Sequence, residues 1–269
     1  MRIRKLFAAA ATAALAATVF AAPAEAATRF YFFQFNMAGN TMNEGGVGVA
    51  KAVVASVKDS KRWPYIVTLN EVCLNQHNYI RTRLDDHGYV GTWGPTGPKC
   101  KNGAAYGNAI FVKSGRTILG NFALPNPNNT EQRKILCVRS NRYDKWVACV
   151  THISHKSADQ KTQINAVATR VDSYRNGGNR VVVGGDFNVT PNSPWIDPMY
   201  ASCYPGGKGR FYETDRAKCD GRGGEGTHSK GKIDYLFYSS HFYSFWGDAT
   251  SSNYSDHDPL WGRAYLANP

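Results

Sequence analysis

Several features are missing from the sequence, and each absence narrows the class of protein. None of the six cysteines stands in a Cys-x-x-Cys pair, which argues against a structural zinc site. After residue 26 no long uncharged apolar run occurs, so we expect no stable membrane insertion. The chain has no internal repeat and no linker, and its 269 residues are therefore expected to form one layered domain rather than two.

Acidic residues are scarce relative to basic ones. The chain has 20 Asp and Glu against 32 Lys and Arg, which gives a net charge of +12, and +10 remains without residues 1–26. Such an excess favours a polyanionic partner through phosphate neutralisation and counterion release. Charge alone is weak evidence, because many secreted basic proteins bind no nucleic acid.

The first 26 residues have the pattern of a secretory signal peptide. Three bases occur within the first five residues, residues 6–22 are apolar, and Ala24-Glu25-Ala26 has the small-x-small form of a cleavage site. A membrane anchor is the alternative, but 17 mostly alanine residues are marginal as a span. We therefore expect a secreted, extracellular protein whose folded part is residues 27–269.

An even number of cysteines behind such a leader predicts disulfides. Proximity in the sequence favours the pairs Cys73–Cys100, Cys137–Cys149 and Cys203–Cys219, although about fifteen pairings of six cysteines exist. The middle pair has the most support, because residues 132–139 and 145–153 form two predicted strands around a turn at 141–144.

Hydrophobic patterns predict strands and helices intermixed along the whole chain. Strands are predicted at residues 30–35, 65–69, 105–112, 132–139, 145–153, 181–183, 233–239, 241–246 and 259–266. Helices are predicted at 46–59, 75–87 and 158–175, the second ending at Gly88. This mixture predicts an α/β fold built in layers.

Residues 204–232 differ from the rest of the chain. They hold eight glycines, seven Lys or Arg and four acids, with no apolar period. The stretch is either a solvated loop or a loop that faces a substrate, since binding groups concentrate on such connections.

Polar residues recur at the ends of the predicted strands. The set comprises Asn36, Asn70, Glu71, Thr151, His152, Asp186, Asn188, Asp234, Asp256 and His257. Taken singly, each has an ordinary explanation, such as an Asx turn or a solvated strand end. Taken together, carboxylate and amide oxygens suit Mg²⁺ or Mn²⁺, and histidines beside them suit proton transfer or phosphate contact.

Seven short motifs, in their order and spacing, resemble those of the endonuclease/exonuclease/phosphatase superfamily. That superfamily includes deoxyribonuclease I, exonuclease III, neutral sphingomyelinases and inositol polyphosphate phosphatases. The motifs are Phe35-Asn36, Asn70-Glu71-Val72, Gly107-Asn108-Ala109-Ile110, Thr151-His152-Ile153-Ser154, Gly185-Asp186-Phe187-Asn188, Ile233-Asp234-Tyr235 and Ser255-Asp256-His257-Asp258-Pro259. They run from residue 36 to residue 259, so the resemblance covers nearly all of residues 27–269.

The resemblance implies a fold and a site. The fold is a four-layer α/β sandwich of two mainly antiparallel sheets flanked by helices, with the site at one end. By position, the resemblance implies that Glu71 is the principal ligand of Mg²⁺ or Mn²⁺, with Asn36 and Asp256 beside it. It implies that Asp186 and Asn188 orient the attacking water and hold the phosphate. His257 would be the catalytic histidine, supported by Asp234, and His152 would be a phosphate contact or leaving-group acid.

Two positions depart from the family pattern, and a third is ambiguous. Some members have an acid two residues after the first Asn, where this chain has Ala38, so a second metal-binding carboxylate is not expected there. Asn70 replaces a common glutamine and keeps the amide. Arg133 is a further candidate for phosphate contact, although an ordinary surface-strand arginine is the equal alternative.

The residues leave three functions open. We expect a monomeric extracellular nuclease that hydrolyses DNA. A sphingomyelinase-like phospholipid phosphodiesterase is the first alternative, for which residues 241–246, rich in aromatics, would be a membrane contact unless they form a buried edge strand. A catalytically inactive binding protein is the second alternative, and the intact set of polar residues argues against it.

Overall fold

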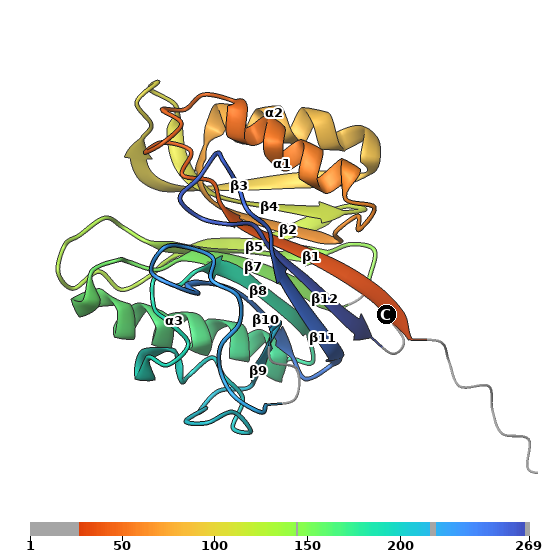
Figure 1. Cartoon of the computed structure of the whole chain (residues 1–269), viewed down its shortest axis with the longest axis vertical. Helices are drawn as coiled ribbons and strands as arrows, with labels where there is room; N and C mark the ends of the chain where they lie inside the picture. Colours follow the sequence, from red (N-terminus) through yellow and green to blue (C-terminus); the bar gives the residue numbers. More distant parts are fainter. Residues whose placement is uncertain (1–26, 144, 216–218, 267–269) are drawn as a thin grey trace, which may run out of the picture.

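Two six-stranded sheets pack face to face at the centre of the computed structural model (Figure 1), which describes residues 27–143, 145–215 and 219–266. The first sheet has the order β11 (Phe242–Ala249), β12 (Leu260–Leu266), β1 (Thr28–Asn36), β2 (Ile66–Cys73), β4 (Ala105–Lys113) and β3 (Tyr89–Lys99). The second has the order β5 (Arg116–Ala123), β6 (Lys134–Ser140), β7 (Trp146–His152), β8 (Arg180–Asp186), β10 (Asp234–Ser239) and β9 (Phe211–Glu213). The expected signal peptide, residues 1–26, lies outside the described range.

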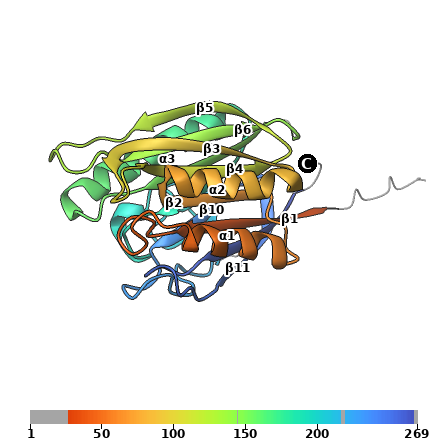
Figure 2. The ribbon, with the colours of Figure 1, turned by 90° about the horizontal axis from the view of Figure 1, so that it is seen from above.

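Helices cover the two outer faces. Helices α1 (Gly48–Asp59) and α2 (Leu74–Leu84) lie on the first sheet, and α3 (Ser157–Asn176) lies on the second (Figures 1 and 2). Three apolar clusters fill the three interfaces between these four layers. The predicted four-layer α/β sandwich is therefore confirmed.

The alternation of side chains along β1 explains how one strand serves two interfaces. Phe33 and Phe35 pack against the helices α1 and α2, whereas Phe30 and Phe32 pack between the two sheets. The inter-sheet series then continues with polar residues, Gln34 and Asn36, both buried. The inner face of this strand is thus apolar at one end of the sandwich and polar at the other.

The same change from apolar to polar occurs on four other strands. Their inner faces pass from Ile66 to Asn70 on β2, from Trp146 to His152 on β7, from Val182 to Asp186 on β8 and, running the other way, from Tyr238 to Asp234 on β10. Parallel pairing of β1 with β2 and of β7 with β8 brings their carboxyl ends together, while antiparallel pairing sets Asp234 opposite Asp186. A buried polar cluster therefore closes one end of the sandwich.

Most predicted elements are present, with three additional strands. Strands β3, β5 and β9 were not predicted, and β9 lies inside the glycine-rich stretch 204–232. Gly88 ends the short 3₁₀ turn Asp85–His87 that follows α2, with φ 77°. A second 3₁₀ turn spans Pro194–Ile196. No helix among the described residues is long and apolar enough to cross a membrane.

All three predicted disulfides are formed: Cys73–Cys100, Cys137–Cys149 and Cys203–Cys219. Cys137 and Cys149 stand directly opposite each other in the β6–β7 pair, as the hairpin pattern predicted, although Asp144 of that turn lies outside the described range. Three disulfides fit an oxidising, extracellular environment.

Candidate active site

The buried polar cluster at the end of the sandwich brings together most of the predicted site residues. Asn36 connects two carboxylates: its Nδ2 donates to Glu71 Oε1 at 3.2 Å and to Asp186 Oδ2 at 3.0 Å. Its Oδ1 accepts the backbone N–H of Ala38 at 3.1 Å. The amide nitrogen of Asn36, rather than its oxygen, therefore faces the carboxylates, which differs from the oxygen ligand expected from the sequence.

A break in the β2–β4 pairing carries Glu71 into this cluster. The register shifts between Leu69 and Val72, and Glu71 has φ 57°, in the left-handed region. Bulges of this kind redirect side chains next to active sites. Ala38 (φ 43°) and Asn188 (φ 52°) also have positive φ, so three non-glycine residues in unfavourable conformations line one site. The surrounding contacts must hold this backbone in place.

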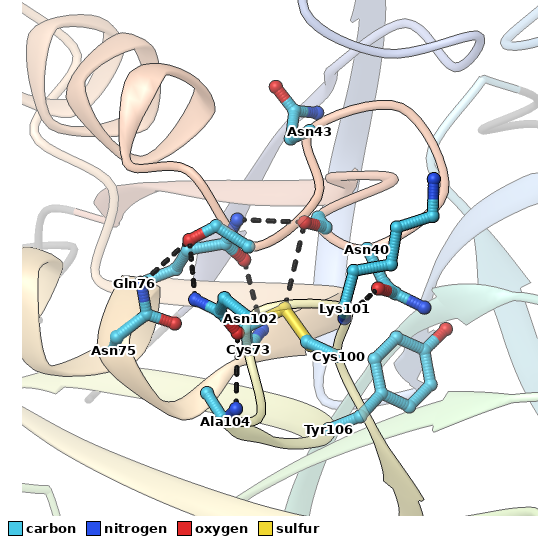
Figure 3. The surroundings of a disulfide bond; sticks show 12 residues. Asn40, Asn43, Cys73, Asn75, Gln76, Cys100, Lys101, Asn102, Ala104 and Tyr106 are labelled. Atoms are coloured by element: carbon cyan, nitrogen blue, oxygen red, sulfur yellow. Dashed lines mark hydrogen bonds between the residues drawn. A yellow bond between two sulfur atoms is a disulfide. The ribbon is translucent and has the colours of Figure 1, made fainter.

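Hydrogen bonds from the first turn of α2 hold the backbone around Glu71. Figure 3 shows the neighbouring residues Cys73 and Gln76. The Gln76 side chain donates to Gly39 O (2.9 Å) and Gly46 O (2.8 Å) and accepts from the N–H of Cys73 (2.9 Å). Gly39 in turn donates its N–H to Glu71 O, and a Cβ on Gly39 would lie 2.4 Å from that oxygen. The Cys73–Cys100 disulfide joins this corner to the end of β3. Glycine is required at position 39 by this close approach.

Asp186 is the centre of the hydrogen-bond network. Its Oδ2 lies near Nδ2 of Asn36 (3.0 Å), Nδ2 of Asn188 (3.3 Å), Nε2 of His152 (3.3 Å) and Nε2 of His257 (3.7 Å). Burial alone would raise the pKa of Asp186, but the hydrogen bond from His152 and the charges of both histidines lower it to about 2. The carboxylate is thus ionised at neutral pH and acts as an acceptor.

His257 and Asp234 form a direct pair. Nδ1 of His257 lies 2.7 Å from Oδ2 of Asp234, and both side chains are buried. Burial opposes the charged ring, but the charge and hydrogen bond of Asp234 raise the pKa of His257 to about 9. The carboxylate fixes the hydrogen on Nδ1 and directs Nε2 toward Asp186.

His152 has the opposite arrangement. Nη1 of Arg133 lies 2.6 Å from Nδ1 of His152, and a guanidinium can only donate, so Nδ1 accepts and Nε2 carries the hydrogen. Arg133 is 5% exposed and also lies near Glu131 (3.5 Å). This arginine is therefore a buried residue and not an ordinary surface one. It fixes His152 as a hydrogen-bond donor toward the cluster.

Asp256 lies on the exposed side of the cluster, with a carboxylate oxygen within 4.8 Å of a ring nitrogen of His257. Its side chain is 55% exposed, and its Oδ2 lies 3.5 Å from Nε2 of His228. His228 was not predicted as a site residue. It lies in the glycine-rich stretch, directly after Thr227, whose Oγ1 accepts the N–H of Asp234 at 3.0 Å. Part of the glycine-rich stretch 204–232 therefore borders the site, which agrees with the interpretation of that stretch as a loop that faces a substrate.

The side chains fit a divalent cation. Within the described part of the chain, two groups have ligand atoms within 4.8 Å of one another, namely Asp186, Asp234 and His257, and His228, Asp256 and His257. The half-buried carboxylate of Glu71 adjoins the first group through Asn36. Carboxylate oxygens dominate this donor set, and they suit hard cations.

Solved structures share this fold. The catalytic domain of human Nocturnin, with a bound sulfate anion, superposes with a TM-score of 0.70 at 17% identity, over 88% of this chain and 94% of that chain. ANGEL2, a 2′,3′-cyclic phosphatase in complex with adenosine-2′,3′-vanadate, gives 0.65 at 16% identity, over 89% and 96%. A mannosyl-6-phosphatase of Bacteroides thetaiotaomicron gives 0.64 at 15% identity, over 88% and 100%. Such identities establish the fold and not the substrate.

A comparison with curated protein sequences gives no match. The sequence profile described as the Endonuclease/Exonuclease/phosphatase family, however, matches residues 33–257, which is most of the chain. The matched segment includes Asn36, Glu71, Asp186 and His257, the residues that meet at the end of the sandwich. The chain therefore belongs to the endonuclease/exonuclease/phosphatase family of phosphoester-cleaving hydrolases.

Proposed function

We propose that this protein is a secreted, monomeric phosphodiesterase that requires Mg²⁺ or Mn²⁺ and hydrolyses DNA, with residues 27–269 as its catalytic domain. The observation that carries the proposal is the ring of nitrogen donors around one buried oxygen of Asp186, next to the carboxylate of Glu71. Donors arranged in this way can surround an oxygen of a phosphoryl group as well as a carboxylate oxygen.

Glu71 is the proposed principal metal ligand, with Asp256 as a second carboxylate. A divalent ion bound there supplies positive charge that polarises the phosphate and stabilises the charge of the transition state. Asn36 orients Glu71 and Asp186 through its amide nitrogen, and its oxygen could become a ligand only after a rotation that breaks the bond to Ala38.

The remaining residues divide the proton chemistry between them. Ionised Asp186, with Asn188 beside it, orients the attacking water by accepting its hydrogen. His257, its Nδ1 bound to Asp234, holds or moves a proton at Nε2. His152, its Nδ1 bound to Arg133, donates from Nε2 to a phosphate oxygen or to the leaving oxygen. Water adds to phosphorus, the bond to one ester oxygen breaks, and that oxygen leaves with a proton.

DNA is the preferred substrate because of the charge balance. The net charge of +10 outside residues 1–26 favours a polyphosphate over a single phosphoester. Two bases of the glycine-rich stretch do not contribute, since Arg222 is paired with Asp197 (2.7 Å) and Lys232 is buried against Glu213 (3.2 Å). Lys230 remains exposed on the turn that carries His228.

The aromatic segment 241–246 gives little support to the lipid alternative. It forms the first half of edge strand β11, in which Phe242 is buried, Phe245 stacks on Tyr238 (5.1 Å) and Trp246 packs against Arg62 (5.0 Å). Only Tyr243 of these four aromatic side chains is largely exposed, at 43%. This packing fits the edge-strand interpretation.

The test is hydrolysis of three substrates by the purified secreted protein: supercoiled plasmid DNA, RNA and sphingomyelin vesicles, each with Mg²⁺, Mn²⁺ or EDTA. We expect nicking of the plasmid with metal and none with EDTA. Cleavage of sphingomyelin without cleavage of DNA would reassign the substrate, and full activity in EDTA would refute the metal requirement.

A further inference from the structure

A third histidine, His228, borders the site on a turn rather than on a strand. Its ring lies 4.7 Å from the ring of His257, at an interplanar angle of 54°. Its Nε2 lies 3.5 Å from Oδ2 of Asp256. The side chain of His228 is 10% exposed, against 55% for Asp256, so an ordered donor faces a largely solvated carboxylate.

The tautomer of His228 follows from its other nitrogen. The backbone N–H of Lys230 points at Nδ1 from 2.9 Å, and a backbone N–H can only donate. Nδ1 is therefore the acceptor, and the hydrogen of the neutral ring is on Nε2, facing Asp256. A nitrogen that carries a hydrogen cannot bind a metal ion, so His228 presents an N–H toward the carboxylate of Asp256, 3.5 Å away, and does not act as a third ligand.

Backbone pairing holds the turn that carries His228. His228 and Gly231 exchange backbone hydrogen bonds of 3.1 and 2.8 Å, and Asp258 donates its N–H to Thr227 O at 2.8 Å. The carboxylate of Asp256 also has a local contact, since its Oδ1 accepts from Ser255 Oγ at 3.5 Å. Of the two partners, the imidazole is held by the backbone pairing of its turn, whereas the carboxylate is more exposed and has two contacts of 3.5 Å.

We propose that His228 is a positioning residue that orders the carboxylate of Asp256 for capture of the divalent cation. This inference rests on the proposed role of Asp256 as a metal ligand. An ordered carboxylate loses less side-chain freedom on binding than a free one, and partners that orient metal ligands contribute roughly tenfold to a hundredfold to metal affinity.

The experiment measures Mn²⁺ binding to the purified secreted protein in the absence of substrate, from the electron paramagnetic resonance signal of the free ion. His228→Ala is expected to weaken binding by about tenfold or more. His228→Gln, which places an amide N–H at a comparable reach, is expected to restore most of the affinity. Lys230→Ala is the matched control, because it changes the same turn but keeps the backbone N–H that fixes the ring.

Two further variants separate this inference from the proposed function. Asp256→Asn is expected to weaken Mn²⁺ binding, and adding His228→Ala to it is expected to produce no further loss, because His228 acts through that carboxylate. Independent losses in the double variant would overturn the inference, as would unchanged affinity in His228→Ala. If Glu71→Gln also left Mn²⁺ binding unchanged, the metal assignment itself would fail, whatever the result for His228.

Discussion

The pairing of His257 with Asp234 allows a quantitative test of the proton chemistry. The perturbation is Asp234→Asn, which keeps the shape and removes the charge. Oδ1 of Asp234 accepts a hydrogen bond from Nε2 of Gln34 at 3.4 Å. In the variant, the side-chain oxygen of the asparagine would keep this acceptor position, and its nitrogen would then face Nδ1 of His257. The substitution would therefore remove the charge that stabilises the protonated ring, and in the neutral ring it would move the hydrogen from Nδ1 to Nε2, which is the wrong tautomer for accepting a proton.

The expected losses follow from this geometry. General acid–base groups contribute about 10²- to 10⁴-fold to rate, so His257→Ala should lower kcat by about that factor, or roughly 3–5 kcal/mol. Asp234→Asn should lower kcat by at least about a hundredfold. The double variant should be little slower than the slower single variant, because residues that act as a unit are not additive.

Steady-state rates on plasmid DNA, measured for the wild type, the two single variants and the double variant, would complete the double-mutant cycle. Circular dichroism would confirm that each variant is folded. Losses that multiply in the double variant would refute the claim that Asp234 and His257 act as one unit. A nearly unchanged Asp234→Asn enzyme would also refute it. In the second case Asp234 would only support the start of β10, and His152 would be the better candidate for proton transfer.

The same pair predicts a dependence of stability on pH. Because the folded-state pKa of His257 is raised from 6.5 to about 9, its stabilising effect is complete below about pH 6.5 and is lost as pH rises through about 9. We expect the melting temperature of the metal-free protein in EDTA, measured between about pH 6 and 10, to decrease as pH rises through that window. In Asp234→Asn this decrease should be smaller. An unchanged profile in the variant would show that another group controls this window.

Four further predictions follow from the site and its supports. Glu71→Gln should lower activity by at least about a hundredfold in saturating Mg²⁺, measured against wild type with EDTA as the blank. Arg133→Met should lower kcat by at least about tenfold with little change in KM, whereas a loss in KM alone would mean direct phosphate contact. With about four phosphate contacts, log K for DNA should fall with log salt at a slope near −3.6, and a flat response in a filter-binding assay would favour a small or lipid substrate. Lys232→Met should destabilise the fold by about 3–5 kcal/mol in urea unfolding, because it leaves the buried carboxylates of Glu213 and Asp215 unpaired.

The polar cluster on the strands could be predicted from the sequence because alternation fixes the face of each side chain. Once Phe30 and Phe32 face the second sheet, Asn36 must face it too, and the same holds along β2, β7, β8 and β10. The family motifs added the four-layer arrangement and the roles of the residues, which alternation does not contain. Together these two sources predicted the sandwich and which side chains would meet.

The strands that were missed carry patterns that oppose a strand. Strand β3 contains Pro95 and Pro98 with three glycines, and proline cannot donate to a sheet ladder, so its position at the sheet edge is what permits it. Strand β5 is also an edge strand, and its side chains are only partly buried. Strand β9 has three residues, too few for any period. Tertiary pairing, rather than local preference, determines all three.

The contact between Asp256 and His228 was beyond sequence analysis for a different reason. Asp256 was expected as a metal ligand, and its carboxylate lies 3.5 Å from His228, a residue that no pattern selected. The backbone bond from Asp258 to Thr227 brings these segments together across 31 residues of chain, and neither segment carries a local signal for the other. Thr-His-Ser-Lys-Gly has the composition of any exposed turn. A strand determines the direction of its own side chains, whereas a turn depends on the segment with which it pairs. The strand residues and the motif at residues 255–259 could therefore be predicted, but the contact with His228 could not.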